Sequence, residues 1–264
     1  MTPVSRVFPL LLFLCATAAA RPHVVRHPGA VPASPASVMW IAAHPDDESV
    51  AAPLLTDWYR VQHARCTFLI FTRGEAGACL RLDACGADLA TTRSAEAGAA
   101  SQYFRADSIH LTLPDGGGAT APPWKLSDAV ISAVAGFIDT VRPELVLTFD
   151  PRHGTTCHPD HAAVAEIVLA AVNKLSSRPL VYFLETRVTI TASPLSISLA
   201  PAFPDAERFD ANNAWQSIID DMRIHKSQFN DAFIDAIAAV PAAGRAVFIA
   251  PAASAFQSAT APCP

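Results

Sequence analysis

The sequence predicts an α/β protein with a mostly parallel sheet flanked by helices, and three observations lead to this prediction. Short apolar runs alternate with longer helical patterns, the order expected of βαβ units. The run at 144–149 is almost wholly apolar, as is typical of a central strand covered on both faces. Clusters rich in His and Asp follow two of these runs, where open α/β sheets bind their ligands. The expected fold is therefore a single Rossmann-like domain.

The elements are expected in regular alternation along the chain. Strands are predicted at 37–43, 66–72, 108–113, 144–149, 180–184, 188–190 and 246–250, and helices at 48–60, 87–104, 126–141, 161–175 and 213–229. Residues 191–206, rich in Pro, Ser and Ala, are predicted to form an extended loop. These elements place the domain at residues 37–250.

The composition supports one catalytic domain of ordinary size. The chain has 264 residues, of which 51% are hydrophobic, and this is enough for one sizeable core. Its formal net charge is −5, and it contains no run of Lys or Arg. We therefore expect no nucleic-acid partner, and a small neutral or polar molecule fits better as the substrate. The oligomeric state is left open.

The two ends of the chain lie outside the expected domain. Residues 1–20 contain one Arg, an apolar run and a small-residue end, a pattern typical of a secretory signal peptide. Cleavage is expected near Ala20, which gives an exported protein, periplasmic or secreted, with no integral membrane segment in the mature chain. A retained membrane anchor is the alternative. Residues 21–36 are a Pro-rich lead-in, and residues 251–264 are expected to be a loose tail.

The cysteines that remain after cleavage allow disulfides if the protein is exported. Cys79 and Cys85 lie six residues apart in a loop and can close a small ring, whereas Cys66 lies in an apolar strand and is expected to be an inert buried thiol. The pairing of Cys157 and Cys263 is left open. Cys157 precedes a histidine but is a weak candidate nucleophile, because neighbours in sequence seldom face each other.

The two polar clusters lie at predicted junctions between a strand and a helix. The first is His44-Pro-Asp-Asp-Glu48, and the second runs from Asp150 to His161 and ends in His158-Pro-Asp-His161. One histidine alone is most often a core residue, and one aspartate a helix cap. Two such clusters at the carboxyl ends of strands indicate a metal site instead.

The residue types in the clusters indicate the kind of metal and reaction. Catalytic zinc is bound by His nitrogen and carboxylate oxygen, with three protein ligands and one open position. His44, Asp47 and His161 can supply this set. Asp46 is then left to accept a proton from a water activated by the metal, and His158, one helical turn before His161, can act as a cation or proton donor. The combination indicates hydrolysis of an amide or an ester. Fe²⁺ or Mn²⁺ would be accepted by the same ligands.

These motifs strongly resemble those of the LmbE-like (PIG-L) zinc-dependent N-deacetylases, which remove acetyl from N-acetylglucosamine units. Weaker landmarks follow in family order: Phe71-Thr-Arg-Gly-Glu75, Arg93 with Glu96, Leu113-Pro-Asp-Gly116, Phe149-Asp-Pro151 and His225-Lys-Ser-Gln228. The resemblance covers about residues 37–230. One departure is Cys157, at a position where the family is expected to have Gly.

The resemblance implies a role for each candidate residue. His44, Asp47 and His161 are implied to be zinc ligands, and Asp46 is implied to be the general base. His158 is implied to stabilise the oxyanion and to protonate the leaving amine. Asp160 is implied to support His158 or a ligand, and Glu48 is implied to be a structural residue. Spacing alone favours an exposed ion pair between Arg93 and Glu96. The resemblance instead implies that Arg93 contacts the substrate, with Asp115 as a weaker candidate for sugar hydroxyls.

The function implied is removal of acetyl from an N-acetylated amino sugar or glycoconjugate by zinc-activated water. A related metallo-esterase, or a deacylase acting on a non-sugar amide, is the first alternative, because a fold and a metal limit the reaction more than the substrate. A non-catalytic sugar-binding protein is the second. Such a protein would lack Asp46 or a metal ligand, and this sequence retains them all.

Overall fold

The computed structural model describes residues 34–86, 88–118, 121–204 and 206–252. The expected signal peptide, nearly all of the Pro-rich lead-in and most of the expected tail, including Cys263, lie outside the described residues. Within these residues, no helix combines the length and the apolar character needed to cross a membrane.

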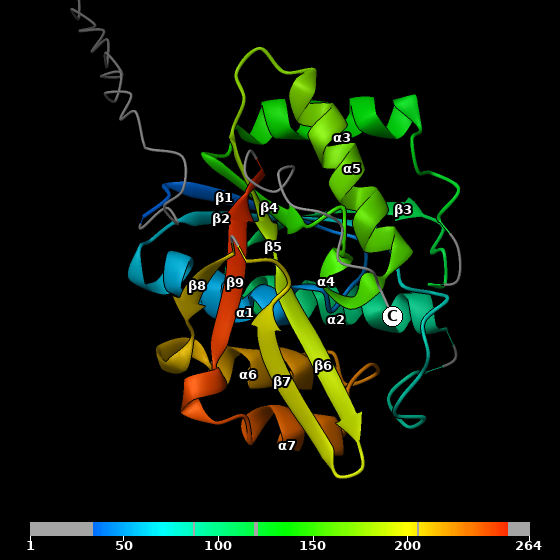
Figure 1. Ribbon diagram of the computed structural model, residues 1–264. Coiled ribbons are helices and arrows are strands. Elements are labelled where there is room, and N and C mark those ends of the chain that lie inside the picture. Colours follow the sequence, from blue (N-terminus) through cyan, green and yellow to red (C-terminus); the bar gives the residue numbers. More distant parts are fainter. Residues whose placement is uncertain (1–33, 87, 119–120, 205, 253–264) are drawn as a thin grey trace, which may run out of the picture.

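A seven-stranded sheet in the order β3-β2-β1-β4-β5-β9-β8 forms the centre of the protein (Figure 1). Its strands are β1 (Ser37–Ala42), β2 (Arg65–Thr72), β3 (Asp107–Leu113), β4 (Leu145–Phe149), β5 (Leu180–Leu184), β8 (Glu207–Asp210) and β9 (Ala246–Pro251). The first five in chain order are parallel, and β9 pairs antiparallel with both β5 and β8. The predicted α/β fold with a mostly parallel sheet is confirmed.

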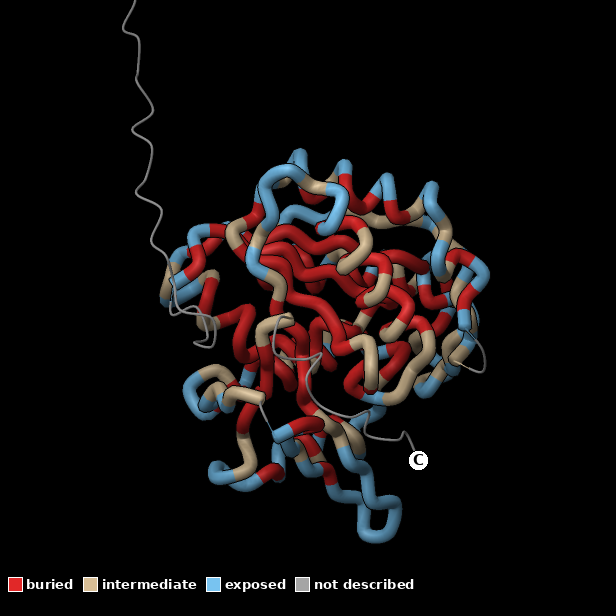
Figure 2. Tube along the Cα trace, turned by 45° about the horizontal axis from the view of Figure 1, so that its top comes forward, coloured by how far each residue is buried: buried red, intermediate tan, exposed pale blue. Residues whose placement is uncertain are grey.

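Helices cover both faces of the sheet. On one face lie α3 (Asp128–Val141) and α5 (Pro159–Asn173), and on the other lie α1 (Glu48–Thr56), α2 (Leu89–Tyr103) and α6 (Gln216–Ile224) (Figure 1). Alternate residues of β1 separate two cores, since Trp40 packs with the α1 side and Ile41 with the α3 side. Figure 2 shows the buried positions gathered in the strands and the exposed ones along the outer helix surfaces.

The predicted loop at 191–206 is wrong. A hairpin lies there instead, in which β6 (Thr186–Ala192) pairs antiparallel with β7 (Leu195–Pro201). The physical reason is a period-two pattern, because Leu195, Ile197 and Leu199 alternate with small or polar residues as on a half-buried strand.

The predicted helix at 213–229 is shorter than expected. A 3₁₀ turn, η2 (Asn212–Ala214), precedes α6, and a second helix, α7 (Asp231–Ala238), follows it. Asn230 separates the two helices, because its side chain accepts the backbone N–H of Phe233 and so caps α7. The helix α7 packs against α6 and β7, and together with the hairpin it extends the protein below the sheet in Figure 1.

The strand order reverses between β1 and β4. These strands are neighbours, but the chain continues from β1 to β2 on one side and from β4 to β5 on the other. The loops that leave β1 and β4 therefore diverge, and a crevice opens at the carboxyl edge of the sheet. The two predicted His/Asp clusters follow these two strands, so the fold brings them to the same crevice.

Helix α1 is attached to α6 by polar contacts between buried side chains. Glu48 Oε1 lies 2.7 Å from His225 Nε2, and the Ser49 hydroxyl donates to Asp221 Oδ2 at 2.6 Å. Burial alone lowers the pKa of His225, but the carboxylates of Glu48 and Asp221 raise it to about 9. His225 is therefore protonated at neutral pH and pairs with Glu48. This contact fixes the start of α1, directly after the first cluster.

Replacing His225 with Gln is expected to remove one pH-dependent contribution to stability. The pKa in the folded protein, about 9, exceeds the ordinary value of 6.5. The contribution is therefore fully present below about pH 6.5 and is lost as the pH rises through 9. Across this window, the His225 contribution to the free energy of unfolding of the native protein should fall by on the order of 1 kcal/mol per pH unit. Urea unfolding at several pH values measures it.

The matched control is Arg223→Gln, an exposed position on the same helix. It should retain the native slope, whereas His225→Gln should show a flatter one. Equal slopes in the two variants would contradict a charged His225.

Candidate metal centre

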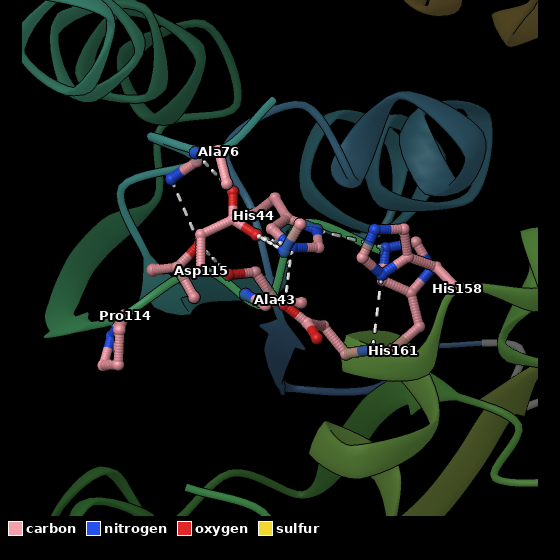
Figure 3. Close-up of polar contacts among 12 residues, drawn as sticks. Ala43, His44, Ala76, Pro114, Asp115, His158 and His161 are labelled. Carbon is pink, nitrogen blue, oxygen red and sulfur yellow. Dashed lines mark hydrogen bonds and ion pairs between the residues drawn. The ribbon is translucent and has the colours of Figure 1, made fainter. Parts of the chain in front are cut away.

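Three side chains converge in the crevice after β1 and β4. His161 Nε2 lies 2.9 Å from Asp47 Oδ1 and 3.3 Å from His44 Nδ1, and His44 Nδ1 lies 3.7 Å from Asp47 Oδ2. All three residues are buried. Figure 3 shows His44, from the loop after β1, beside the two histidines that follow β4. Donors at 2.0–2.1 Å from one tetrahedral ion lie roughly 3.3 Å apart, so the spacing fits a single metal ion.

The second ring nitrogen of each histidine has a partner of its own. His161 Nδ1 lies 2.8 Å from the carbonyl oxygen of Gly154, which accepts its proton and leaves the lone pair of Nε2 available to a metal. His44 Nε2 lies 3.2 Å from Asp160 Oδ2 and 3.5 Å from Asp115 Oδ1, so a proton on Nε2 would leave the lone pair of Nδ1 available to a metal. Carbonyl and carboxylate partners of this kind are typical of metal-binding histidines.

The Asp47 carboxylate is oriented by the backbone. The N–H groups of Ala43 and His44 donate to Asp47 Oδ2 at 2.9 and 2.7 Å, which leaves Oδ1 facing His161. Burial by itself raises the pKa of Asp47, but the neighbouring His161 and His44 hold it well below its usual value. The donor set is thus one carboxylate and two imidazoles without cysteine, which suits a catalytic zinc or another divalent ion better than a structural zinc.

The surroundings of His44 favour positive charge. Burial lowers the pKa of His44, but the carboxylates of Asp115, Asp160 and Asp47 raise it well above the usual 6.5. Asp160 is wholly buried and also accepts the backbone N–H of Gly116 at 2.9 Å. A Cβ atom at Gly116 would lie 2.4 Å from Asp160 Oδ1, so glycine permits this close approach. Several carboxylates at short range provide the environment that a divalent cation neutralises.

Asp46 lies beside the donor atoms but is held by different groups. Its Oδ1 lies 3.0 Å from Arg93 Nη2, which also donates to the carbonyl oxygen of Pro45, and Arg93 Nη1 donates to that of Gly74 at 2.9 Å. The backbone φ of Asp46 is +100°, a strained value for a residue with a side chain and one associated with functional sites. Burial raises the pKa of Asp46 against the opposing effect of Arg93. A raised pKa suits a carboxylate that accepts a proton.

Arg93 and Glu96 do not form the exposed ion pair that spacing alone favours. Arg93 is 3% exposed and faces Asp46, while Glu96 is 6% exposed and accepts hydrogen bonds from the backbone and hydroxyl of Ser227. The helix face that they share is turned toward the site and not toward solvent. Arg93 also lines the cavity in front of the site, and its contact with the substrate stays a prediction.

His158 is the N-cap of α5 and stands at the edge of the site. Its Nδ1 accepts the backbone N–H of Asp160 at 3.2 Å, so the neutral ring carries its proton on Nε2. The ring centroid lies 4.7 Å from that of His44 and 4.8 Å from that of His161. Burial, followed by the two neighbouring histidines, lowers the pKa of His158 to about 4. His158 therefore offers an N–H donor at neutral pH.

Asp115 has more partners than a free sugar-binding carboxylate would have. Besides its approach to His44, it accepts the backbone N–H groups of Gly117 at 2.8 Å and Ala76 at 3.1 Å. Burial raises the pKa of Asp115, but the His44 contact and these hydrogen bonds lower it well below its usual value. Figure 3 shows Asp115 between Ala76 and His44. Asp115 lines the cavity, and its contact with a sugar stays a prediction.

The cysteines follow the sequence prediction where it was definite. Cys79 and Cys85 are disulfide-bonded with a Cα–Cα distance of 6.1 Å. Cys66 has a free thiol, and burial raises its pKa to about 12. Cys157 is disulfide-bonded and therefore offers no nucleophilic thiol beside His158.

The site opens into a cavity of about 810 Å³. The predicted polar residues line one end, together with Gln228, whereas the other end is lined by the β6–β7 hairpin, α6 and α7. The sequence reasoning did not assign the hairpin or α7 to the site. Two signals in the sequence indicate them: the period-two pattern at 186–199, and the capping Asn230 followed by apolar residues at helical spacing.

Comparison with protein families gives a match over half of the chain. The model of the PIG-L family, described as GlcNAc-PI de-N-acetylase, matches residues 39–172. This segment contains every predicted ligand, catalytic and substrate-contacting residue.

Curated relatives carry one name. A 1D-myo-inositol 2-acetamido-2-deoxy-alpha-D-glucopyranoside deacetylase from Nakamurella multipartita is 30% identical over 190 residues, which cover 63% of this chain and 62% of that protein. A protein of the same name from Kineococcus radiotolerans is 29% identical over 163 residues, which cover 52% of this chain and 45% of that protein. The chain thus spans about half the length of the curated relatives it matches.

Solved structures share the fold at low sequence identity. The N,N'-diacetylchitobiose deacetylase of Pyrococcus horikoshii has a TM-score of 0.59 and 17% identity, over 76% of this chain and 73% of that one. The 4-carboxy-2-hydroxymuconate hydratase GalB of Pseudomonas putida has a TM-score of 0.62 and 16% identity, over 86% and 99%. One fold thus carries different reactions, and these likenesses support the fold alone. With the family model matched over residues 39–172, the chain belongs to the PIG-L (LmbE-like) family.

Proposed function

We propose that this protein is a metal-dependent hydrolase that removes acetyl from an N-acetylated amino sugar or glycoconjugate. The observation that carries the proposal is the convergence of donor atoms from His44, Asp47 and His161 beside Asp46. The acetamido sugar in the name of the curated relatives supports the substrate class. Export after cleavage near Ala20 is also proposed, from the sequence pattern alone.

Zinc is the proposed metal, with Fe²⁺ and Mn²⁺ as the other candidates, because two imidazoles and a carboxylate accept several divalent ions. One solved relative is described as the zinc-inhibited form of the teicoplanin deacetylase Orf2. The metal should therefore be titrated in any assay and not simply added in excess.

The proposed chemistry assigns a separate task to each residue. An ion held by His44, Asp47 and His161 supplies a Lewis acid for the acetyl carbonyl and lowers the pKa of a water that it contacts. Asp46 accepts the proton of the attacking water while Arg93 holds the Asp46 carboxylate at 3.0 Å. The products are acetate and a free amine.

The N–H of His158 has two tasks in the proposed reaction. Its Nε2 carries the proton, because Nδ1 accepts the backbone N–H of Asp160. The Nε2–H group would donate a hydrogen bond to the developing oxyanion. Once the ring has gained a second proton, the one that Asp46 accepts from water, the imidazolium would protonate the leaving amine and return to the neutral form. The Asp160 carboxylate also lies 3.2 Å from the ring of His44, so this one residue contacts His158 through its backbone N–H and His44 through its side chain.

Removal of the metal is expected to abolish acetate release. Protein treated with a chelator should lose at least about 100-fold in rate, because the ion supplies the Lewis acid. Substoichiometric to equimolar Zn²⁺, Fe²⁺ or Mn²⁺ should then restore the rate. The assay is acetate release from a panel of N-acetyl sugars, N-acetylated polymers, non-sugar amides and acyl esters, with bound metal measured in parallel.

The panel also separates the alternatives. Cleavage of esters alone would identify a metallo-esterase, and cleavage of non-sugar amides alone would identify another deacylase. Sugar binding without acetate release in a metal-replete sample would favour a binding protein.

Asp46→Asn is expected to retain the metal and lose about two or more orders of magnitude in turnover, the usual scale for a general base. The measurements are kcat together with metal content. The control is Asp139→Asn, which makes the same change at an exposed position of α3 and should behave as the native protein. Native turnover by metal-loaded Asp46→Asn would refute the assignment.

A further inference from the structure

The chain between β2 and α2 borders the end of the cavity that contains the metal centre, here called the polar end. In its described residues it forms neither a helix nor a strand. Ala76, Gly77 and Ala78 line the cavity, and the carbonyl oxygen of Gly74 accepts a hydrogen bond from Arg93 Nη1 at 2.9 Å. The position of this segment is therefore fixed by contacts other than those of a regular backbone ladder.

The same segment is joined to Asp115 on the neighbouring loop. The backbone N–H of Ala76 donates to Asp115 Oδ2 at 3.1 Å (Figure 3), and Glu75 Oε1 accepts the backbone N–H of Asp115 at 3.1 Å. A Cβ atom at Gly77 would lie 2.5 Å from Arg93 Nη1, so the segment packs closely against the guanidinium. A shift of the segment would therefore disturb the surroundings of both Arg93 and Asp115.

Apolar packing does little to hold the residues that follow this segment. Leu80 is 52% exposed and Leu82 is 89% exposed, so neither side chain is anchored in the core. The disulfide between Cys79 and Cys85 closes the stretch into a small ring. A covalent ring limits the conformations of a loop that packing leaves free.

The ring is attached to the protein on two sides. The backbone N–H of Leu80 donates to the carbonyl oxygen of Ser227, in the chain that follows α6, at 2.9 Å. The carbonyl oxygen of Cys85 accepts the hydroxyl of Thr92 on α2 at 2.9 Å. Thr92 precedes Arg93 in the sequence, so this attachment reaches the helix that presents the guanidinium to the site. The ring thus lies between two elements that border the cavity.

We propose that Cys79 and Cys85 are positioning residues for the polar end of the cavity. Their disulfide restrains the chain so that Ala76 stays against Asp115 and Gly74 stays against Arg93. A bound sugar would meet the wall that is fixed in this way. The part that concerns substrate binding rests on the proposed function, whereas the restraint of the loop does not.

A disulfide makes this positioning sensitive to thiols. A dithiol breaks the S–S bond, each sulfur gains one electron and one proton, and the dithiol is oxidised to its own disulfide. The half-buried Cys79 offers the more accessible sulfur, because Cys85 is 7% exposed. Opening the ring should leave the metal site in place, since His44 is also held by Asp160.

The double variant Cys79→Ala/Cys85→Ala, loaded with metal, tests the proposal. With the methyl glycoside of N-acetylglucosamine, KM should rise at least about fivefold, well below the roughly 100-fold loss that misplaced reacting groups can cause. Because Arg93 keeps its contact with Asp46, kcat should stay within about twofold of the native value, and the metal content should not change. The matched control is Cys66→Ala, which removes the free thiol of β2 and should retain both native constants.

Hydrogen exchange measures the positioning without any substrate. The backbone N–H groups of Ala76 and Leu80 make the contacts with other loops described above. Both should exchange at least about fivefold faster in the double variant, because the loop opens more often. The internal control is the N–H of Thr72, which donates to the carbonyl oxygen of Ala43 at the end of β2 and should exchange at its native rate.

Chemical reduction provides a second measurement if the double variant folds poorly. The reductant would also reach the disulfide of Cys157, so the protein used is Cys157→Gly, and glycine suits the φ of +60° at this position. Cys79–Cys85 is then the one disulfide left among the described cysteines. Dithiothreitol should raise KM at least about fivefold, as in the double variant, and reoxidation with oxidised glutathione should restore it.

The outcomes separate this inference from the proposed function. Unchanged exchange of Ala76 and Leu80 without the disulfide overturns the inference, whatever the activity. Faster exchange with an unchanged KM overturns the role in substrate binding, and loss of bound metal in the double variant overturns the assigned wall. Faster exchange in the double variant, with no acetate released from any N-acetylated sugar by the metal-loaded native protein, overturns the proposed function and leaves the positioning of the loop standing.

Discussion

The site depends on one imidazole that is held between two carboxylates, one from a loop and one from the start of a helix. Asp160, in the first turn of α5, and Asp115, after β3, both approach His44 Nε2. The ring is thereby turned so that Nδ1 faces Asp47 and His161. Three loops at the carboxyl edge of the sheet are thus joined through a single side chain. Because these carboxylates are engaged with the backbone as well, the orientation of the ring is part of the folded structure and not of any bound ligand.

The first motif serves the site and the core within five residues. His44 and Asp47 face the crevice, whereas Glu48 points into the protein and pairs with His225. Asp46, which lies between His44 and Asp47 in the sequence, has the strained φ of +100°. Two sets of contacts hold Asp46 in this conformation. Arg93 contacts Asp46 and Pro45, and the buried pair of Glu48 and His225 fixes the start of α1. Precision at the carboxylates therefore derives in part from a contact outside the cavity lining, the buried pair of Glu48 and His225.

The fold could be predicted from the sequence because its apolar runs alternate with helical patterns. The meeting of His44, Asp47 and His161 in one crevice could be predicted as well, because parallel strands end at one edge and polar residues after such strands meet there. The surroundings of Arg93 could not, since a spacing of three residues shows which side chains share a helix face but not where that face points. The hairpin was obscured because Pro and Ser at 193–196 suggest a loop, while the alternation on either side requires strands. The partners of Asp115 depend on contacts between distant loops, which local patterns do not contain.

The division of the cavity follows the division of the chain. The polar end is built almost wholly from residues 44–161, and the apolar end from residues 188–237. Substitutions in the later stretch can therefore alter what the cavity accepts while His44, Asp46, Asp47 and His161 keep their positions. Selection can therefore change which compound is preferred without changing the polar residues. A protein designer can likewise replace the hairpin, α6 and α7 together. Such an exchange must preserve the buried contacts of Glu48 and Ser49 with His225 and Asp221, together with the apolar packing between α1 and α6.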